Sequence, residues 1–203
     1  MEPLFVKICG LRTERDVAAA VEAGADAVGF VFAESPRRIE AELVRELVRA
    51  VPEHVLTVGV FRRQPLQEIQ ALTAASGVRA VQLHGDEGRE YYAALRQPGR
   101  TLVRAVAARD SQWSHGNGLG EDLLLLDAPA PGAGVTWDWS APDFAAPEGR
   151  WLLAGGLTVE NVPAAVAATG AWGVDVSSGV ERERGVKDAE LIASFVRAAR
   201  GEA

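Results

Sequence analysis

The hydrophobic positions of this chain follow two alternating patterns. Short apolar runs rich in Val, Leu and Phe recur along it, and most segments between them carry apolar residues three and four positions apart. The first pattern predicts buried strands and the second predicts amphipathic helices. Eight runs are expected to be strands, and they cover residues 4–9, 27–32, 56–61, 80–83, 102–106, 123–126, 151–154 and 173–177.

The helical pattern is clearest in two of the intervening segments. One face of residues 40–51 collects the apolar side chains of Leu43, Val44, Leu47, Val48 and Val51. Residues 188–200 repeat this arrangement, so both segments are predicted to be helices packed on one side. Thr13, followed three positions later by Asp16, has the form of a capping box and predicts a helix N-terminus.

A faint internal repeat supports this division of the chain. Residues 24–30, 77–83 and 170–176 share a leading Gly, a small residue, a Val and a final apolar residue. The Gly is expected to end a helix in the left-handed region, and the remainder is expected to form a buried parallel strand.

The spacing of the strands favours a closed barrel. Successive strands begin about 24 residues apart, which is enough for a strand, a helix and two short loops. Equal βα units fit either an open doubly wound sheet or a barrel, but no GxGxxG motif follows the first strand. We therefore predict an α/β fold, a single (β/α)8 TIM-barrel domain over residues 1–203. Short or degenerate helices are expected in the two connections that lack the helical pattern, 107–121 and 136–147.

Composition and charge narrow the class of protein. The single cysteine excludes an internal disulfide, and no apolar run approaches the roughly 18 residues that span a membrane. The N-terminus lacks the basic and apolar regions of a signal peptide, so a cytoplasmic protein is expected. A net charge of −7 argues against nucleic-acid or membrane partners, although a small anionic ligand needs only local donors.

In a barrel the active site lies at the C-terminal ends of the strands, which directs attention to the first and last ones. Alternation places Lys7 and Cys9 on the inner face of the first strand, and Asp175 and Ser177 on that of the eighth. These strands are neighbours in a closed barrel, so Lys7 and Asp175 could form an interior ion pair with only a structural role. Cys9 is either a small buried hydrophobe or a reactive thiol at the rim.

Asp127 follows a run of four leucines and is expected at the barrel mouth. It could simply cap the following turn. We favour a functional role because the sixth strand lies roughly opposite the first. Cys9 and Asp127 would then face each other across a bound ligand, as an acid–base pair requires.

The last two strand ends carry groups suited to a phosphate. Gly155 and Gly156 allow close approach of the backbone, and Ser177 and Ser178 add hydroxyl donors. Barrels that bind phosphate often do so at these two loops, although two ordinary glycine turns are the alternative.

Other candidate ligand contacts remain open. Arg37 or Arg38 could form a bidentate pair with a ligand carboxylate, but loop arginines are often merely solvated. His84 could touch a substrate or anchor a neighbouring loop. His54, His84 and His115 lie far apart in the sequence and lack the spacing of metal ligands. Nothing in the sequence implies a cofactor.

The order of the motifs resembles the phosphoribosylanthranilate isomerase family. They begin at residue 7, end at residue 188, and comprise KICG, GADAVGFVF with SPR, QLHG, LLLD with WDW, LAGGL, and VDVSSGVE followed by KD. Two departures lie away from the proposed chemistry. Trp137 stands before Asp138 and Trp139 where the family usually has Phe, and Arg184 precedes Gly185 where the family commonly has Pro.

The resemblance implies an Amadori rearrangement of N-(5-phosphoribosyl)anthranilate in tryptophan biosynthesis, by a monomer or homodimer. Carried over, the acid is Asp127, the base is Cys9, and the anthranilate carboxylate binds Arg37, selected by alignment on Ser35 and Ile39. The other implied substrate-binding residues are His84, Gly155, Gly156, Asp175, Ser177 and Ser178. A free thiol is only about 3% thiolate at pH 7, so Cys9 needs help from Lys7 or from the charge of a Schiff base.

Two other classes remain as alternatives. Another phosphate-binding barrel enzyme, such as an indole-glycerol-phosphate synthase or a pentose-phosphate epimerase, would share the last two loops. The epimerase would need a set of metal ligands that three histidines do not supply, and the synthase would need a catalytic lysine at a strand end. The lysines here are Lys7, one layer below the rim, and Lys187, near the last helix. A non-catalytic barrel that binds sugar phosphates would need neither Cys9 nor Asp127.

Overall fold

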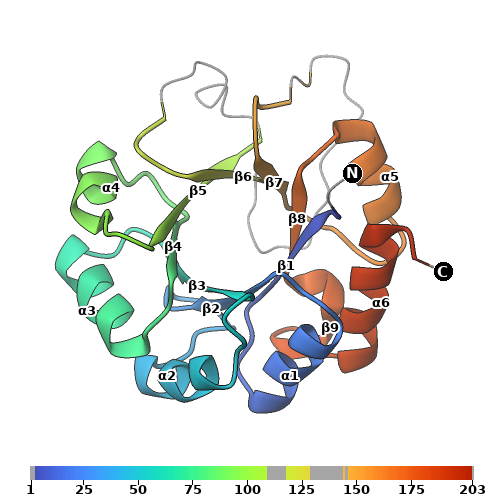
Figure 1. Cartoon of the computed structure of the whole chain (residues 1–203), viewed down its shortest axis with the longest axis horizontal. Helices are drawn as coiled ribbons and strands as arrows, with labels where there is room; N and C mark the ends of the chain where they lie inside the picture. The colour runs from blue at the N-terminus through green and yellow to red at the C-terminus, as the bar shows by residue number, and fades with distance from the viewer. Residues whose placement is uncertain (1–2, 109–117, 129–143, 145, 203) are drawn as a thin grey trace.

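The computed structural model describes residues 3–108, 118–128, 144 and 146–202. Eight parallel strands close into a barrel in chain order, with helices around the outside (Figure 1). The predicted barrel and all eight predicted strands are confirmed. The strands are β1 (Phe5–Cys9), β2 (Ala27–Val31), β3 (Leu56–Phe61), β4 (Ala80–Leu83), β5 (Thr101–Ala107), β6 (Leu123–Asp127), β7 (Trp151–Leu153) and β8 (Gly173–Val176).

The described helices cover the outer face of the barrel. They are α1 (Glu14–Glu22), α2 (Ala41–Arg49), α3 (Leu66–Ser76), α4 (Arg89–Leu95), α5 (Val162–Thr169) and α6 (Ala189–Arg200). Within the described ranges, none of them is long and apolar enough to cross a membrane. The predicted short helices after β5 and β6 fall on segments that lie largely outside the described residues.

An element that the sequence did not predict follows β8. A 3-10 turn, Ser178–Val180, leads into a small antiparallel hairpin of β9 (Glu181–Glu183) and β10 (Val186–Lys187). Its strands are two and three residues long and rich in charge, so they show none of the periodicity that identifies a strand.

The helix ends follow the expected chemistry. The Thr13 side chain accepts a hydrogen bond from the backbone N–H of Asp16 at 3.1 Å, as the capping pattern predicted. Gly77 and Gly170 end α3 and α5 in the left-handed region, and Gly24, with φ 86°, follows α1 by two residues. The repeat therefore marks three equivalent junctions between helix and strand.

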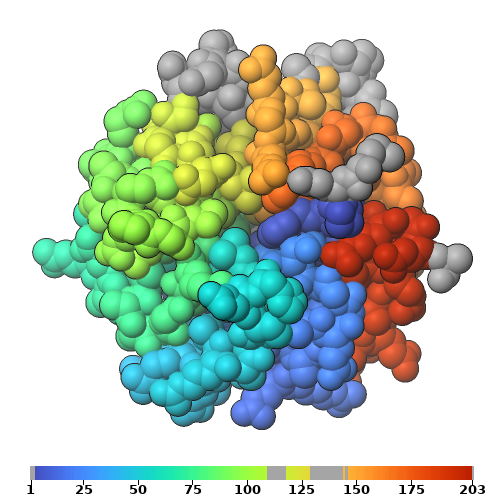
Figure 2. All heavy atoms as spheres, viewed as in Figure 1, coloured from blue at the N-terminus to red at the C-terminus, as the bar shows by residue number. Residues whose placement is uncertain are grey.

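The two ends of the chain meet where the barrel closes. β1 pairs with β8 in a register that sets Lys7 opposite Asp175. Outside this seam, Arg200 of α6 donates a hydrogen bond to the carbonyl of Gly24. In the space-filling view the red C-terminal helix accordingly packs beside the blue N-terminal region (Figure 2).

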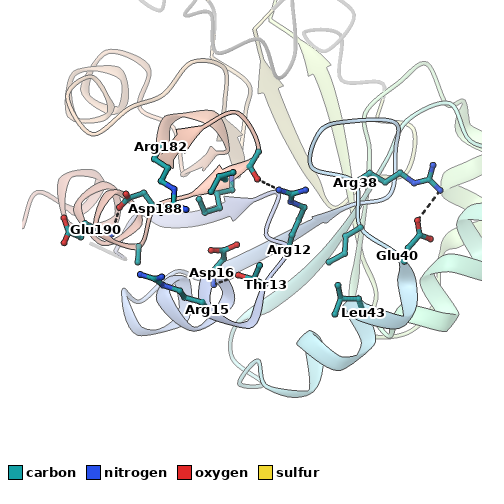
Figure 3. A pocket seen from close by; sticks show the side chains of 15 residues that line it. Arg12, Thr13, Arg15, Asp16, Arg38, Glu40, Leu43, Arg182, Asp188 and Glu190 are labelled. Atoms are coloured by element: carbon teal, nitrogen blue, oxygen red, sulfur yellow. Dashed lines mark hydrogen bonds and ion pairs between the residues drawn. The ribbon is translucent and has the colours of Figure 1, made fainter.

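Alternation along the strands sorts the core as predicted. Val6 and Ile8 are fully buried in the large outer cluster between the strands and helices, whereas Cys9 belongs to a small interior cluster with Val31 and Val60. One prediction was wrong: Leu43 is 43% exposed, although Val44 and Leu47 of the same helix are buried. Leu43 lies at the edge of the apolar stripe and lines a surface groove instead (Figure 3).

Candidate active site

Two adjoining pockets lie at the C-terminal ends of the strands. The larger has a volume of about 290 Å³, and its lining includes Cys9, Arg37, His84, Asp127, Asp175 and Ser177. The smaller, about 50 Å³, is lined by Gly155, Gly156 and Ser178 together with three residues of the larger pocket, Asp127, Asp175 and Ser177. Every residue predicted for the site therefore lines one of these pockets.

A larger groove of about 670 Å³ lies beside α1, α2 and the β9–β10 hairpin (Figure 3). Some of its charged side chains already interact with other protein groups. Arg12 donates to the carbonyl of Gly185, and Arg38 lies 3.7 Å from Glu40. The two adjoining pockets are the better candidate for the active site. The 290 Å³ pocket is lined by both Cys9 and Asp127 at the strand ends, where barrel enzymes carry their chemistry.

The Cys9 thiol lies in a tight, charged environment. Lys7, one layer below, is 1% exposed and donates to Asp175 at 2.8 Å, so the predicted interior ion pair is confirmed. Burial raises the pKa of Cys9 above its ordinary value, while the Lys7 ammonium opposes the rise and Asp175 adds to it. Lys7 therefore acts on the thiol in the expected direction, but burial outweighs it.

Burial lowers the pKa of Lys7, but the charges of Asp175 and Cys9 more than reverse this, and its pKa is raised overall. The ammonium therefore stays charged across the neutral range. A fixed positive charge close to Cys9 favours the thiolate whenever the thiol gives up its proton.

Gly29 of β2 provides the room for the thiol. A methyl group at this position would lie 2.9 Å from Cys9 Sγ and 3.3 Å from Lys7 Cε. Side chains so close to a new carbon must move, and in a packed interior such overpacking costs about 1–3 kcal/mol.

We therefore expect Gly29→Ala to lower the free energy of unfolding by about 1–3 kcal/mol and the turnover rate by about tenfold, since small displacements of a reacting group are costly. Denaturant unfolding and steady-state kinetics would measure both. The stability cost should shrink in a Cys9→Ala background, which removes the nearest atom. An equal cost in both backgrounds would show that Sγ does not set the constraint.

Asp127 is held at the mouth of β6. Its Oδ1 accepts a hydrogen bond from the backbone N–H of Ala128 at 2.7 Å, and its Oδ2 lies 3.2 Å from Nε2 of His84. The imidazole and the carboxylate are close enough for an ion pair when the ring is protonated, although they are not aligned as a hydrogen bond. His84 therefore lies beside Asp127 inside the pocket, and its other ring nitrogen lies 3.4 Å from Gln82.

Gly155 permits the close approach of the segment after β7 to this corner. Its φ is 90°, in the left-handed region, and a Cβ there would lie 2.5 Å from the backbone nitrogen of Ala128. A side chain at position 155 would thus displace the backbone that fixes Asp127.

Of the two candidate arginines, Arg37 is the one that lines the pocket. It is 6% exposed, and its Nε and Nη2 donate to the two carboxylate oxygens of Glu181 at 2.6 and 2.9 Å. The side chain of Arg38 is 57% exposed and lines the groove instead. The structure therefore adds a feature that sequence did not predict, a buried carboxylate already bound to Arg37.

Glu181 and Lys187 of the hairpin are the main residues that sequence reasoning missed. Lys187 donates to Glu181 at 2.9 Å and to the carbonyl of Ser177 at 2.8 Å. Burial alone would raise the pKa of Glu181, but hydrogen bonds from Arg37, Gly185 and Lys187 lower it to about 2. Glu181 lies within the VDVSSGVE motif, yet no spacing could reveal a partner 144 residues away.

The described residues were also compared with the ligand sets of metal sites. Among the described residues, no group of three or more His, Cys, Asp and Glu side chains is placed to hold a metal ion.

Comparison with known proteins agrees with this geometry. Residues 6–198 match the family described as N-(5'-phosphoribosyl)anthranilate (PRA) isomerase. The chain belongs to this family. The isomerase of Geotalea daltonii is 43% identical over 201 residues, which cover 96% of each chain.

Solved structures of family members share the fold. The isomerase of Thermus thermophilus superposes with a TM-score of 0.86 at 34% identity, covering 96% of this chain and 98% of its own. A second family structure, in complex with reduced 1-(o-carboxyphenylamino)-1-deoxyribulose 5-phosphate, superposes with a TM-score of 0.81 at 33% identity, over 98% and 99% of the two chains.

Proposed function

We propose that this chain converts N-(5'-phosphoribosyl)anthranilate into 1-(2-carboxyphenylamino)-1-deoxyribulose 5-phosphate, the Amadori rearrangement of tryptophan biosynthesis. One observation carries the residue assignment: a buried thiol and a buried carboxylate, Cys9 and Asp127, line a single pocket at the C-terminal ends of the strands. An acid and a base on either side of one ligand are what this isomerisation requires.

The proposed reaction begins with two proton transfers, and a final tautomerisation moves a proton to C1 as the C2 hydroxyl loses its own. Asp127, in its protonated form, donates to the ribose ring oxygen, and the C1–O bond breaks to give a Schiff base. The Cys9 thiolate then removes the proton from C2, and the electron pair moves to form an enolamine that tautomerises to the ketone. C1 is reduced while C2 is oxidised, so the enzyme is an intramolecular oxidoreductase, an aldose–ketose isomerase, with no external oxidant.

The remaining pocket residues are proposed to bind the two anionic ends of the substrate. The phosphate would lie on the backbone of Gly155 and Gly156 and on the hydroxyls of Ser177 and Ser178, which line the smaller pocket. The anthranilate carboxylate would bind Arg37. His84 and Asp175 contact Asp127 and Lys7 respectively, so they would act on the substrate and on the catalytic groups together.

The direct test follows the fluorescence of phosphoribosylanthranilate generated in situ. The wild-type protein is expected to remove this signal rapidly. A Cys9→Ala/Asp127→Asn double variant, matched in fold, should remove it no faster than the spontaneous decay. If the wild type is inactive but still binds sugar phosphates, the non-catalytic alternative replaces the isomerase.

The proposal also covers the setting of the reaction. We place it in the cytoplasm, on a small-molecule substrate, with neither nucleic acid nor membrane as a partner. The net charge of −7 supports the absence of nucleic-acid and membrane partners, because a polyanionic surface would repel the protein. The protein would act as a monomer or a homodimer, which light scattering on the purified enzyme would distinguish.

A further inference from the structure

The β9–β10 hairpin, which follows β8, contacts the loops after β1 and β2. Glu181 of the hairpin accepts two hydrogen bonds from Arg37, and Arg12 donates to the Gly185 carbonyl from the loop after β1. A Cβ at Gly185 would lie 3.1 Å from the carbonyl oxygen of Pro36, so the hairpin seats closely on the segment that carries Arg37.

We propose that Glu181 is a positioning residue, which fixes the Arg37 guanidinium for the substrate's carboxylate and thereby sets the preference for a carboxylated aryl amine. This inference rests on the proposed function and adds a residue to it. Glu181 itself is absent from the residues that line the two pockets, so it acts through Arg37.

The geometry of the guanidinium supports this role. A guanidinium has five N–H donors in a rigid planar fork. The bonds to Glu181 use one donor on Nε and one on Nη2, at 2.6 and 2.9 Å. The edge formed by Nη1 and Nη2 is then the one left to face a second carboxylate, and it can also bind in a bidentate manner. Since the plane is fixed on one edge, the orientation of the other edge is fixed as well.

Glu181 is itself held firmly enough to serve as an anchor. Its side chain is 3% exposed, and it also accepts from the backbone N–H of Gly185 at 2.9 Å and from Lys187 at 2.9 Å. Burial lowers the pKa of Lys187 overall, and the charge and hydrogen bond of Glu181 oppose that fall, so the carboxylate favours the ammonium form of this lysine. The anchor is therefore charged, buried and bonded on several sides.

The charge balance gives Glu181 a second effect on specificity. Arg37, Lys187 and Glu181 together carry one net positive charge, and Glu34, Arg62 and Arg184 line the same pocket. A neutral aryl group at this place would leave that charge without a new partner. Sites built to bind a polar group reject analogues that lack it because their own buried groups are then left unpaired.

Binding of two matched ligands tests the inference. The probes are reduced 1-(o-carboxyphenylamino)-1-deoxyribulose 5-phosphate and the same compound without the carboxyl group. We expect Glu181→Gln to weaken binding of the carboxylated ligand by about 10–100-fold, and that of the other by less than about twofold. Calorimetry would measure both. Glu183→Gln, on the same strand but exposed, is the matched control and should change neither.

A second comparison shows whether Glu181 acts through Arg37. In an Arg37→Met background, Glu181→Gln should produce no further loss of the carboxylated ligand, since the group it orients is gone. In steady-state kinetics, Glu181→Gln should raise KM by a similar 10–100-fold while kcat changes by less than about threefold and the pH dependence of kcat stays in place.

Glu181→Asp protects the test against misfolding. It keeps the negative charge beside Lys187 but is one methylene shorter, so it should fold and still lose the bidentate grip on Arg37. The inference would be overturned if either variant bound both ligands equally more weakly. It would also be overturned if neither variant bound the carboxylated ligand more weakly than the wild type does. Failure of the wild type to turn over phosphoribosylanthranilate would instead overturn the proposed function, because ligand selectivity is read from binding alone.

Discussion

Replacing Cys9 by alanine is expected to lower kcat/KM for phosphoribosylanthranilate about a thousandfold, which corresponds to about 4 kcal/mol of transition-state stabilisation. The thiolate is the proposed acceptor of the C2 proton, and no other sulfur exists in the chain except that of one methionine. Cys9→Ser is the near-isosteric control. Its hydroxyl fills most of the same space but is far too weakly acidic to supply a base, so it should be equally inactive.

The pH dependence of the wild type should carry the same signature. Burial raises the pKa of Cys9, so the thiolate fraction of the free enzyme grows as the pH rises through and beyond neutrality. We expect kcat/KM to increase with pH up to a limit above the ordinary range of a thiol, and this ascending limb should vanish in both Cys9 variants. Rates in Cys9→Ala that remain high and still follow the same limb would exclude the thiol as the base.

Asp127→Asn should also reduce kcat about a thousandfold, for a different reason. The amide has nearly the shape of the carboxyl group and its oxygen can still accept from the backbone N–H of Ala128. It cannot deliver a proton to the ring oxygen, so opening of the ring becomes slow. Binding of the reduced product analogue should change by less than about threefold. Asp86→Asn, which removes an exposed carboxylate after β4, is the matched control.

Deuterium at C2 of the substrate separates the two roles. In the Cys9 variants, removal of the C2 proton limits the rate, so a large primary isotope effect is expected. In Asp127→Asn, ring opening comes first and limits the rate, so the isotope effect should be close to unity. Similar isotope effects in the two variants would contradict the assignment of separate acid and base steps.

The barrel could be predicted because buried parallel strands are apolar on both faces and stand out as continuous runs. The same alternation that buries Val6 and Ile8 against the helices places Lys7 and Cys9 inside the barrel. The ion pair with Asp175 was one of the alternatives that this placement allowed, and the structure contains it. Asp127 could be identified because it follows a run of four leucines at the position where the strand is expected to end.

Other features depended on contacts that sequence does not encode locally. Glu181 belongs to a three-residue strand, too short for any period, and its partner Arg37 is distant in the chain. The positive charge near Cys9 was visible in sequence, but the degree of burial that outweighs it was not. Leu43 fits the helical period and is nevertheless exposed, because its neighbours across the groove do not cover it.

The pairing of β1 with β8 has a consequence for how the protein folds during its synthesis. Lys7 and Asp175 are 168 residues apart, and Ser177 donates to the carbonyl of Cys9 across the same gap. Because a chain is made from its N-terminus, the strand that carries the thiol is made well before the strand that pairs with it. Throughout synthesis the growing chain therefore carries a lysine without its counter-ion, and the surroundings of the thiol are completed in the step that closes the ring. Activity in such a barrel therefore reports that synthesis has passed β8 and that the ring of strands has closed.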